Sequence, residues 1–337
     1  MMKQLSVLET EQAILYLKRR FEDSLARELD LYRVSSPLFV PGDSGMQDNL
    51  NGIERPVSFE VLDVPGLNCE IVHSLAKWKR AALAQYAIGP GRGIYTDMNA
   101  LRPDEENLRS GIHSIYVDQW DWEQVILPEE RTLDTLIRTV KGIYRVIKNT
   151  EQAIQEAYGV SPGLPEEIHF IHTQELLDRY PDRTPKERED LICREHKAVF
   201  LIGIGGGLSD GTAHDGRAPD YDDWITPTGE GRRGLNGDIL VWNPVLERAF
   251  ELSSMGIRVD QHSLMEQLRL RDALDRTALP WHRRLLEGRL PQTIGGGIGQ
   301  SRMSMLLLNK RHIGEVQVSV WPRDVVESCR REGIALL

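Results

Sequence analysis

The sequence predicts an α+β fold in which a largely antiparallel sheet is flanked by helices. Candidate strands follow one another through short, hairpin-like polar connections, and candidate helices occur in blocks rather than in strict alternation with strands, as is typical of this class. The 337 residues show no internal repeat, low-complexity linker or break in composition. Length alone allows about two domains, but the uniform composition indicates a single domain spanning residues 1–337.

Composition narrows the class of protein and its partners. Hydrophobic residues make up 40% of the chain and charged residues 27%, which is enough apolar material for a globular core. The formal net charge of −10 argues against nucleic acid as a main partner, because phosphate contacts favour a basic surplus. The three scattered cysteines predict neither a disulfide framework nor a zinc site, and fit a cytoplasmic protein. No run of about 18 apolar residues occurs, so no membrane partner is expected.

The N-terminal half predicts two long helices and several strands. An apolar stripe at helical spacing, from Ile14 to Leu25, predicts a helix over residues 11–29 with Thr10 as its N-cap. Pro37 interrupts the extended segment that follows, so this segment is expected at a sheet edge or an interface, because proline cannot donate to a strand ladder. Further strands are expected at residues 57–64, 70–72, 93–101 and 114–122, and further helices at residues 74–85 and 130–157.

The C-terminal half contains one long segment without a regular pattern. Residues 205–237 are rich in Gly, Pro and Asp and lack apolar periodicity, which predicts loops. Strands are expected at residues 168–172, 199–204, 238–242, 249–252 and 316–320, and helices at residues 185–196, 281–287, 300–308 and from residue 263 onward.

Common nucleotide and hydrolase signatures are absent or misplaced. No G-x-x-x-x-G-K-[ST] or G-x-G-x-x-G motif occurs, which excludes the P-loop and Rossmann interpretations. Gly207–Gly211 matches G-x-S-x-G around Ser209. A nucleophile elbow requires a strand that leads directly into a helix, whereas Ser209 is expected in a loop, so the match is interpreted as chance.

The glycine-rich segment 293–299 is expected to be a loop that leads into the helix at residues 300–308. Gly295, Gly297 and Gly299 would allow close approach of the backbone to a ligand, and a helix N-terminus favours anions. Arg302 lies in the first turn of that helix, where a positive charge is disfavoured. Stacking on a base or contact with a phosphate would explain its position, but a surface arginine beside a tight turn is equally compatible with the pattern.

Several charged residues near strands could form a site. If the strands that carry Asp238 and Glu251 pair, the two carboxylates could bind a hard cation together with phosphates, although a solvated strand face gives the same spacing. Arg258 follows a glycine turn and could bind a carboxylate through two hydrogen bonds. Arg102, at a strand end, could bind a phosphate or be an ordinary loop-end charge.

A second strand carries alternating polar and aromatic residues. Gln119, Asp121 and Glu123 are expected on one face, with Trp120 and Trp122 on the other. This pattern is typical of a pocket wall, and an exposed sheet face would produce it as well.

The order of these residues resembles the catalytic core of class II aminoacyl-tRNA synthetases, particularly the aspartyl and asparaginyl branch. The sequence resembles still more closely the ammonia-dependent asparagine synthetases, or aspartate–ammonia ligases, which share that core. Leu101 replaces a usual aromatic residue before Arg102, and Ser301 stands where a glutamate often precedes the final arginine. Both departures favour the ligases over the tRNA enzymes. The supporting segments are residues 46–50, 73–80, 100–105, 116–123, 218–224, 251–258 and 292–302.

This resemblance implies roles for individual residues, with ATP and Mg²⁺ as cofactors. Arg102 would bind the α-phosphate, with Glu105 nearby, and Arg302 would contact the adenine or the phosphate tail. Gly295, Gly297 and Gly299 would border the nucleotide, and Asp238 and Glu251 would hold Mg²⁺. The aspartate pocket would consist of Lys79, Gln119, Asp121, Ser254 and Arg258, with Asp48 and Asp222 near the amino group or the ammonia.

The implied reaction is the ATP-dependent amidation of aspartate by free ammonia in a single catalytic domain, with a β-aspartyl-adenylate intermediate and AMP and pyrophosphate as products. The first cysteine is Cys69, and no separate region with a thiol nucleophile for glutamine use is evident. The resemblance also implies a homodimer that involves the N-terminal helix and the Pro37 segment.

Three alternatives remain open at this point. A tRNA-charging enzyme would need an anticodon-binding module, for which the residues before Asp48 leave no room. A regulatory paralogue should lack some of the charged site residues, all of which are present. A serine hydrolase at Ser209 is a distant third.

Overall fold

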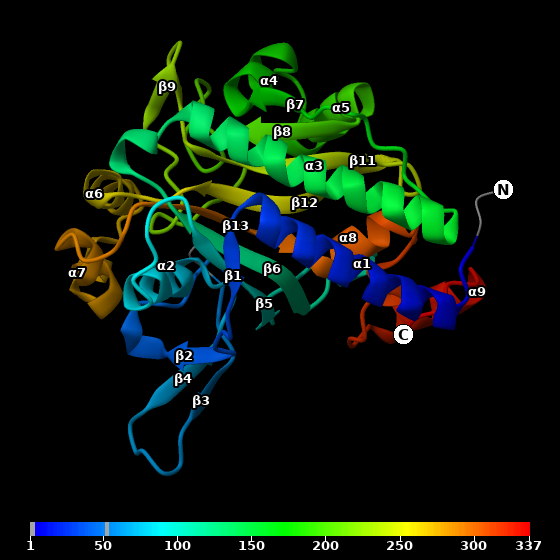
Figure 1. Ribbon diagram of the computed structural model, residues 1–337, viewed down its shortest axis with the longest axis horizontal. Coiled ribbons are helices and arrows are strands. Elements are labelled where there is room, and N and C mark those ends of the chain that lie inside the picture. Colours follow the sequence, from blue (N-terminus) through cyan, green and yellow to red (C-terminus); the bar gives the residue numbers. More distant parts are fainter. Residues whose placement is uncertain (1–3, 51–53) are drawn as a thin grey trace.

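Figure 1 shows the computed structural model, which describes residues 4–50 and 54–337. Its centre is an eight-stranded sheet with the order β1-β5-β6-β13-β12-β11-β8-β7. The inner strands pair antiparallel, and only the outermost pairs, β1 with β5 and β7 with β8, are parallel. The predicted α+β class is therefore confirmed. The strands are β1 (Leu31–Arg33), β5 (Gly93–Leu101), β6 (Tyr116–Val125), β13 (Thr293–Gly299), β12 (Arg248–Ile257), β11 (Asn236–Asn243), β8 (Ala198–Ile202) and β7 (His169–His172).

One face of this sheet is covered by α1 (Val7–Glu28), α3 (Leu133–Tyr158) and α8 (Gln300–Leu307), and α1 and α3 run side by side across it (Figure 1). Helix α1 begins earlier than predicted, because Ser6 accepts a hydrogen bond from the Glu9 amide while the Glu9 carboxylate accepts one from Ser6. This reciprocal capping box satisfies amides that the first helical turn leaves unpaired. Thr10 is therefore not the N-cap but lies within the first turns.

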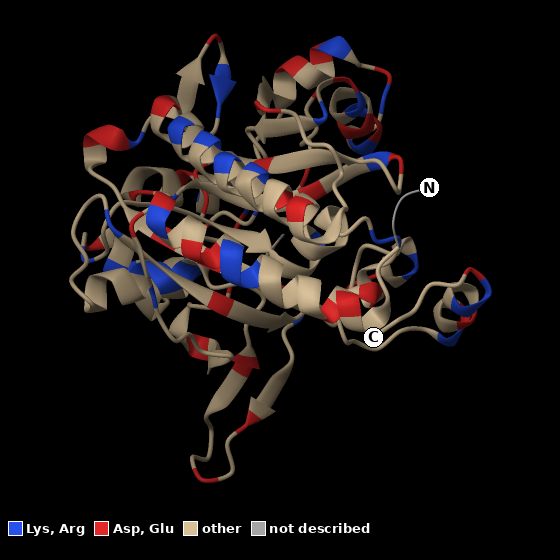
Figure 2. Ribbon diagram, turned by 45° about the vertical axis from the view of Figure 1, so that its right-hand side comes forward, with Lys and Arg blue, Asp and Glu red and all other residues tan. Residues whose placement is uncertain are grey.

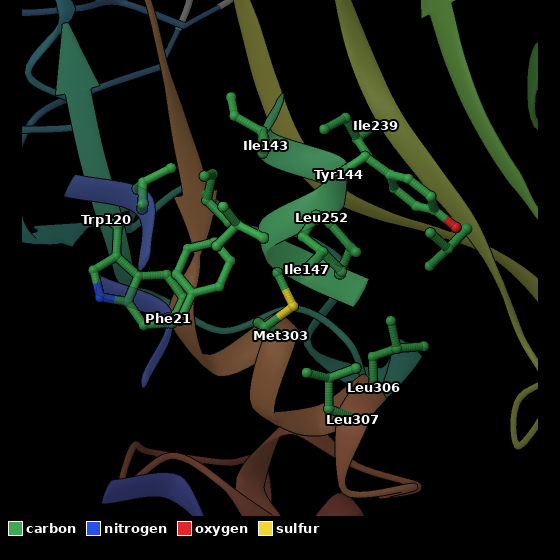
Figure 3. Packing of buried hydrophobic residues seen from close by; sticks show 14 of the residues in the cluster. Phe21, Trp120, Ile143, Tyr144, Ile147, Ile239, Leu252, Met303, Leu306 and Leu307 are labelled. Atoms are coloured by element: carbon green, nitrogen blue, oxygen red, sulfur yellow. The ribbon is translucent and has the colours of Figure 1, made fainter. Parts of the chain in front are cut away.

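The core between this face and the helices is dominated by large apolar side chains (Figure 3). Phe21 of α1 packs on Trp120 of β6, with ring centroids 4.4 Å apart. Met303 of α8 lies among the side chains of α1 and α3. Burying each such side chain stabilises the fold by about 1.5–3 kcal/mol, which holds β6 firmly against the helices.

Basic and acidic residues are interspersed along α1 and α3 (Figure 2). Arg145 of α3 reaches Glu28 of α1 across the gap, with an Nη2–Oε1 distance of 2.5 Å. Because the arginine is largely exposed, this ion pair adds at most about 1 kcal/mol. The apolar stripes beneath, and not the surface charges, hold the two helices in place.

Other helices cover the two ends of the opposite face. Helix α2 (Ala76–Gln85) lies over β5, β6 and β13, whereas α5 (Pro185–His196) lies over β8, β11 and β12. A three-stranded sheet projects from the body in Figure 1. The remaining elements are β2 (Phe39–Pro41), β3 (Ser58–Glu60), β4 (Asn68–Ile71), α4 (Thr173–Arg179), β9 (Pro227–Gly229), β10 (Arg232–Arg233), α6 (Gln261–Leu270), α7 (Pro280–Leu286) and α9 (Arg323–Arg331).

Two sequence predictions for the C-terminal part of the chain are wrong. The segment 293–299 is not a loop but strand β13, in the middle of the sheet. The expected closing strand at residues 316–320 is irregular, with Val318 and Val320 71% and 72% exposed, and helix α9 follows it. Among the described residues, no helix is long and apolar enough to cross a membrane.

Candidate active site

A cavity of about 760 Å³ opens on the sheet face opposite α1 and α3. Its walls come from β6, β11, β12 and β13, the segment after β5, the segment before β11 and the start of α2. A smaller cavity of about 120 Å³ joins it, because both are lined by Arg102, Glu105, Gln119, Glu251 and Gly297. The two cavities therefore share part of their walls.

Strand alternation explains which side chains reach this site. Successive residues of a strand point to opposite faces, so Trp120 and Trp122 of β6 enter the apolar core while Gln119 and Asp121 line the large cavity. Glu123 lies on the same face of β6 and is fully buried. Two of the three predicted residues, Gln119 and Asp121, thus lie in a cavity wall, whereas Glu123 lines neither cavity, and the face is not an exposed sheet surface.

An irregularity in β12 brings two polar residues three positions apart onto the cavity face. The register pairs Ile239 with Ser253 but Leu240 with Glu251, so it shifts by one residue. A bulge of this kind re-aims the side chains that follow it. Glu251 and Ser254 consequently both line the cavity, beside Asp238 on the paired strand.

The glycines of β13 form a floor without side chains beneath the polar residues of β6. A Cβ atom at Gly295 would lie 2.0 Å from Glu123 Oε2, and one at Gly297 would lie 2.2 Å from Gln119 Oε1. These glycines allow the side chains of β6 to lie across the strand, as expected where glycine occurs inside a sheet. Gly297 lines both cavities and Gly299 the smaller one, whereas Gly295 is covered by Glu123 and reaches neither. The nucleotide-bordering role expected for Gly295 is therefore not supported.

Arg258 lies between two carboxylates at one end of the site. Its Nε lies 3.0 Å from Glu123 Oε1, its Nη2 2.8 Å from Glu123 Oε2, and its Nη1 2.5 Å from Asp222 Oδ1. A guanidinium has five N–H donors, so with its partners in residues 4–50 and 54–337 each terminal nitrogen keeps one donor for a ligand. Burial alone would raise the pKa of Glu123, but the charges of Arg258 and Lys79 outweigh it and keep that pKa below its ordinary value.

Arg217 supplies a second cation that sequence analysis missed. Its guanidinium donates to the Ser254 hydroxyl and to Asp238 Oδ1, the latter at 2.7 Å, and its Nε lies 3.5 Å from Asp222 Oδ2. Burial alone would lower the pKa of Arg217, but Asp238 and Asp222 raise it well above its ordinary value. The residue lies in the loop segment 205–237, where no periodicity points to it, and its only sequence signal is its position directly before the segment 218–224.

Lys79 lies beneath the cavity floor and does not line the cavity. Its ammonium group donates to the Asp121 carboxylate, to the Trp122 carbonyl at 2.8 Å and to the Gly296 carbonyl at 3.3 Å. The side chain is fully buried. The structure therefore corrects its expected direct contact with substrate: Lys79 positions Asp121 and ties β6 to β13.

The other end of the site carries two arginines that are less fully paired. In the described part of the chain, Arg102 makes one hydrogen bond, from Nη2 to the His73 carbonyl at 3.1 Å, and its Nε has no partner. Burial lowers the pKa of Arg102, and the nearby Arg302 lowers it further. Arg302 lies 3.4 Å from Glu251 Oε2 and over the ring of Phe250. Among the described residues Arg102 has no carboxylate partner, and its donors in the cavity wall suit a polyphosphate.

Asp238 and Glu251 lie close enough to influence each other. Burial raises the pKa of Asp238 to about 6, with Glu251 adding to the rise and Arg217 opposing it. Burial also acts to raise the pKa of Glu251, but Arg302 and Lys186 bring it below its ordinary value. Among the described residues, no three His, Cys, Asp or Glu side chains form a metal-binding group. Two carboxylates fit Mg²⁺ when substrate phosphates supply further oxygens.

The two aspartates expected near ammonia have different environments. Asp222 lines the cavity but is engaged by Arg258 and Arg217. Asp48 is fully buried and does not line the cavity, because Ser74 lies in front of it and donates a 2.7 Å hydrogen bond to Asp48 Oδ2. Ser209 is exposed in the loop between β8 and β9 and does not itself join a strand to a helix, and its hydroxyl accepts a hydrogen bond from the Gln174 side chain, so the hydrolase interpretation is not supported.

Comparison with known proteins agrees with this arrangement. A family model described as aspartate–ammonia ligase matches residues 8–333. The chain is 57% identical over 334 residues to an aspartate–ammonia ligase of Clostridium perfringens strain SM101, which covers 99% of this chain and 96% of that protein. The chain belongs to the aspartate–ammonia ligase family. A second ligase of this family, from C. perfringens strain 13, matches to the same extent.

Solved structures extend the likeness to the fold of the family. The asparaginyl-tRNA synthetase of Entamoeba histolytica, in complex with asparaginyl-adenylate, superposes with a TM-score of 0.64 at 14% identity, covering 93% of this chain and 69% of that one. The corresponding enzyme of Pyrococcus horikoshii, also with asparaginyl-adenylate, gives 0.63 at 15% identity, covering 93% and 70%. The predicted class II aminoacyl-tRNA synthetase core is thus confirmed as the fold of this ligase family member.

Proposed function

We propose that this protein converts L-aspartate, ammonia and ATP into L-asparagine, AMP and pyrophosphate. Family membership supports this reaction, and one observation carries it for this chain. A single cavity holds Arg258 between two carboxylates at one end and the incompletely paired Arg102 at the other. An amino acid and a nucleotide phosphate can therefore meet inside one site.

In the first step, the aspartate side-chain carboxylate attacks the α-phosphorus of ATP, and pyrophosphate leaves. Arg102 neutralises the negative charge that grows on the α-phosphate, and Arg302 binds the nucleotide beyond it. The free N–H groups of Arg258 orient the amino acid through a carboxylate, while Asp121 and Asp222 face its ammonium group. Such positioning and charge neutralisation are the main contributions a protein makes to phosphoryl chemistry.

In the second step, ammonia attacks the acyl carbon of β-aspartyl-adenylate, and AMP leaves. Because ammonium resembles a lysine amine and is protonated at neutral pH, it must lose a proton near the cavity. The Ser74 hydroxyl lines the cavity and is bonded to Asp48. Ser74 accepts a proton from ammonium as its own proton passes to Asp48, so the proton ends on the buried carboxylate, which becomes neutral, and free ammonia remains to attack. Asp222 is the weaker candidate because Arg258 and Arg217 already engage it.

Mg²⁺ would be held by Asp238 and Glu251 together with the phosphates, where it would neutralise charge on the leaving pyrophosphate. The carboxylates lie next to Arg217 and Arg302, so the metal would complete a balanced set of charges around the polyphosphate. Glu105 and Gly297, which border both cavities, would lie beside the nucleotide.

We further propose that residues 1–337 form a single catalytic domain that acts as a cytoplasmic homodimer, without nucleic acid as a partner. Leu8 and Leu15 of α1 are 69% and 52% exposed, and Leu38 beside Pro37 is 50% exposed. Apolar side chains at these places would be covered by a second copy. Sedimentation of the wild-type protein and of Leu15→Glu tests the dimer.

The deciding experiment measures products from purified protein with ATP and aspartate, with and without ammonium. We expect AMP, pyrophosphate and asparagine in equal amounts when ammonium is present, and no asparagine with glutamine in ammonia-free buffer. Formation of ADP with asparagine would contradict the adenylate route. Turnover with glutamine would contradict the nitrogen source.

A further inference from the structure

We infer that Lys77, held in place by Asp220, is a positioning residue that sets the charge of Asp48 for the ammonia step. This inference rests on the proposed function, and in particular on Asp48 as the final proton acceptor. It concerns a cluster of charged side chains behind the cavity wall, formed by Asp48, Lys77, Asp220, Arg276 and His282, which we name the rear cluster.

Lys77, like its neighbour Lys79, has an almost fully enclosed side chain. It lies in α2, its side chain is 2% exposed, and its Nζ lies 3.1 Å from Asp220 Oδ2 and 3.9 Å from Asp48 Oδ1. The ring of Trp281 lies 5.9 Å away. A buried ammonium group is costly unless it is paired with carboxylates, and here two carboxylates lie within 4 Å of the same cation.

Asp220 is anchored from the far side. Its Oδ2 accepts hydrogen bonds from His282 Nε2 at 2.9 Å and Arg276 Nη1 at 3.0 Å, in addition to Lys77. These partners come from α7 and the turn before it, so three separate parts of the chain meet at one carboxylate. Asp220 is therefore a fixed counter-charge, and the position of Lys77 between the two aspartates follows from it.

The arrangement of Lys77 and Asp48 is not explained by a contribution to stability alone. Asp48 Oδ2 accepts hydrogen bonds from Ser74 and from the Ala76 amide, but in the described part of the chain Asp48 Oδ1 has none. A buried acceptor without a donor costs about 1–3 kcal/mol. Lys77 has three donors, and among the residues that the structure describes it uses one of them, on Asp220. Its charge thus faces an oxygen that is ready to gain a proton.

All charged groups around Asp48 act on its proton affinity. Burial raises the pKa of Asp48. The charge of Lys77 and the hydrogen bond from Ser74 lower this pKa, whereas the charges of Asp220 and Asp121 raise it. Burial lowers the pKa of His282, so this ring is neutral at neutral pH. Glu70 also feels the charge of Lys77. Removing Lys77 and removing the Asp220 charge must therefore move the proton affinity of Asp48 in opposite directions.

The test measures the two half-reactions separately. Pyrophosphate–ATP exchange with aspartate reports adenylation, and addition of ammonium to preformed enzyme-bound adenylate reports amide formation at a series of pH values. We expect Lys77→Met to move the acidic limb of the amide-forming profile to higher pH and Asp220→Asn to move it to lower pH, each by about one unit. The rate of pyrophosphate–ATP exchange should change by less than about threefold. A shift of one pH unit corresponds to a tenfold change in the protonation equilibrium, or about 1.36 kcal/mol, so the two effects are distinguishable.

Lys310→Met is the matched control. Lys310 is also buried, bonds to Thr10 of α1 and lines neither cavity, so its loss tests general damage from removing an enclosed lysine, and its profile should coincide with that of the wild type. Shifts of the two profiles in opposite directions support the inference. If circular dichroism shows that only one of the two variants folds, the direction of the shift in that variant decides the test. Unshifted profiles, shifts of the same sign, equal loss of both half-reactions, or failure of both variants to fold would overturn it.

The proposed function is tested independently by Asp48→Asn. If that variant retains exchange and loses amide formation while the profiles of the cluster variants do not move, only the role of Lys77 falls. If Asp48→Asn forms asparagine normally, the proton acceptor itself has been misassigned.

Discussion

The guanidinium of Arg258 and the carboxylate of Glu123 form a two-point contact, with Nε 3.0 Å from Oε1 and Nη2 2.8 Å from Oε2. The pair connects β6 to the end of β12 and leaves the remaining Arg258 donors directed to Asp222 and the cavity. The orientation of this arginine is therefore determined before any substrate arrives.

The first prediction follows from that geometry. Lysine keeps the charge but not the planar fork of arginine. Arg258→Lys should therefore lower kcat/KM for aspartate tens- to a hundredfold, which corresponds to a loss of about 2–3 kcal/mol of transition-state stabilisation. The KM for ATP should change little. Steady-state kinetics check this. Arg188→Lys is the control, because Arg188 is equally buried but donates to the Tyr180 and Pro181 carbonyls away from the site. Unchanged aspartate kinetics in Arg258→Lys would remove this residue from the pocket.

The second prediction concerns the glycine floor. A methyl group at Gly297 would meet Gln119 Oε1 at 2.2 Å, so Gly297→Ala should displace Gln119 and lower activity at least tenfold. Overpacking of this kind costs about 1–3 kcal/mol, and thermal unfolding should show a lower Tm. Gly89→Ala serves as the control because a Cβ there meets nothing within 4 Å. If both variants behave alike, the floor does not require glycine at residue 297.

The third prediction separates the two aspartates. Asp222 holds Arg258 at 2.5 Å, so Asp222→Asn should impair both pyrophosphate–ATP exchange and asparagine formation. Asp48 contacts Ser74 and not the cavity, so Asp48→Asn should keep exchange and lose asparagine formation. Parallel half-reaction assays compare them. The same pattern of loss in both variants would show that the two carboxylates do not have different roles.

The fourth prediction is a pH dependence of metal binding. The pKa of Asp238 is raised to about 6, so its carboxyl is neutral below that pH and charged above it. Because metal ligands must be deprotonated, the apparent affinity for Mg²⁺ with ATP should rise as pH increases through about 6 and then level off. Asp238→Asn should weaken binding and abolish this rise. Asp260→Asn, at the N-cap of α6, should retain it, and a flat wild-type profile would argue against Asp238 as a ligand.

Regular amphipathic elements were predictable from the sequence because their periodicity is a local property. The strand at residues 93–101 and the helix at residues 185–196 have the predicted bounds. The glycine segment 293–299 was mispredicted because glycine usually weakens strands. Here the reason for glycine lies on a different strand, where Gln119 and Glu123 need room, and such a requirement cannot be read from neighbouring residues.

The positions of site residues were predictable where the family resemblance supplied their order along the chain. They were less predictable where contacts between distant segments determine which side chains reach the cavity. Arg102, Arg258 and Glu251 lie in the cavity wall as expected. Arg217 was missed because its role depends on Asp222, Asp238 and Ser254, which only the folded chain brings together. Asp48 and Lys79 were assigned to the pocket itself, but their side chains lie one layer behind it, and burial depth has no local sequence signal.

The bare floor of β13 also determines how substrate choice could be altered. Side chains from this strand cannot take part in selecting a different amino acid, because any addition at residue 295 or 297 collides with β6 before it reaches the ligand. A library aimed at longer or shorter acids should therefore keep both glycines and vary Gln119 and Ser254, which face the cavity from the flanking strands. A shorter side chain at residue 119 would deepen the pocket while the backbone of β13 beneath it stays unchanged. The cavity could thus be enlarged without remodelling a loop.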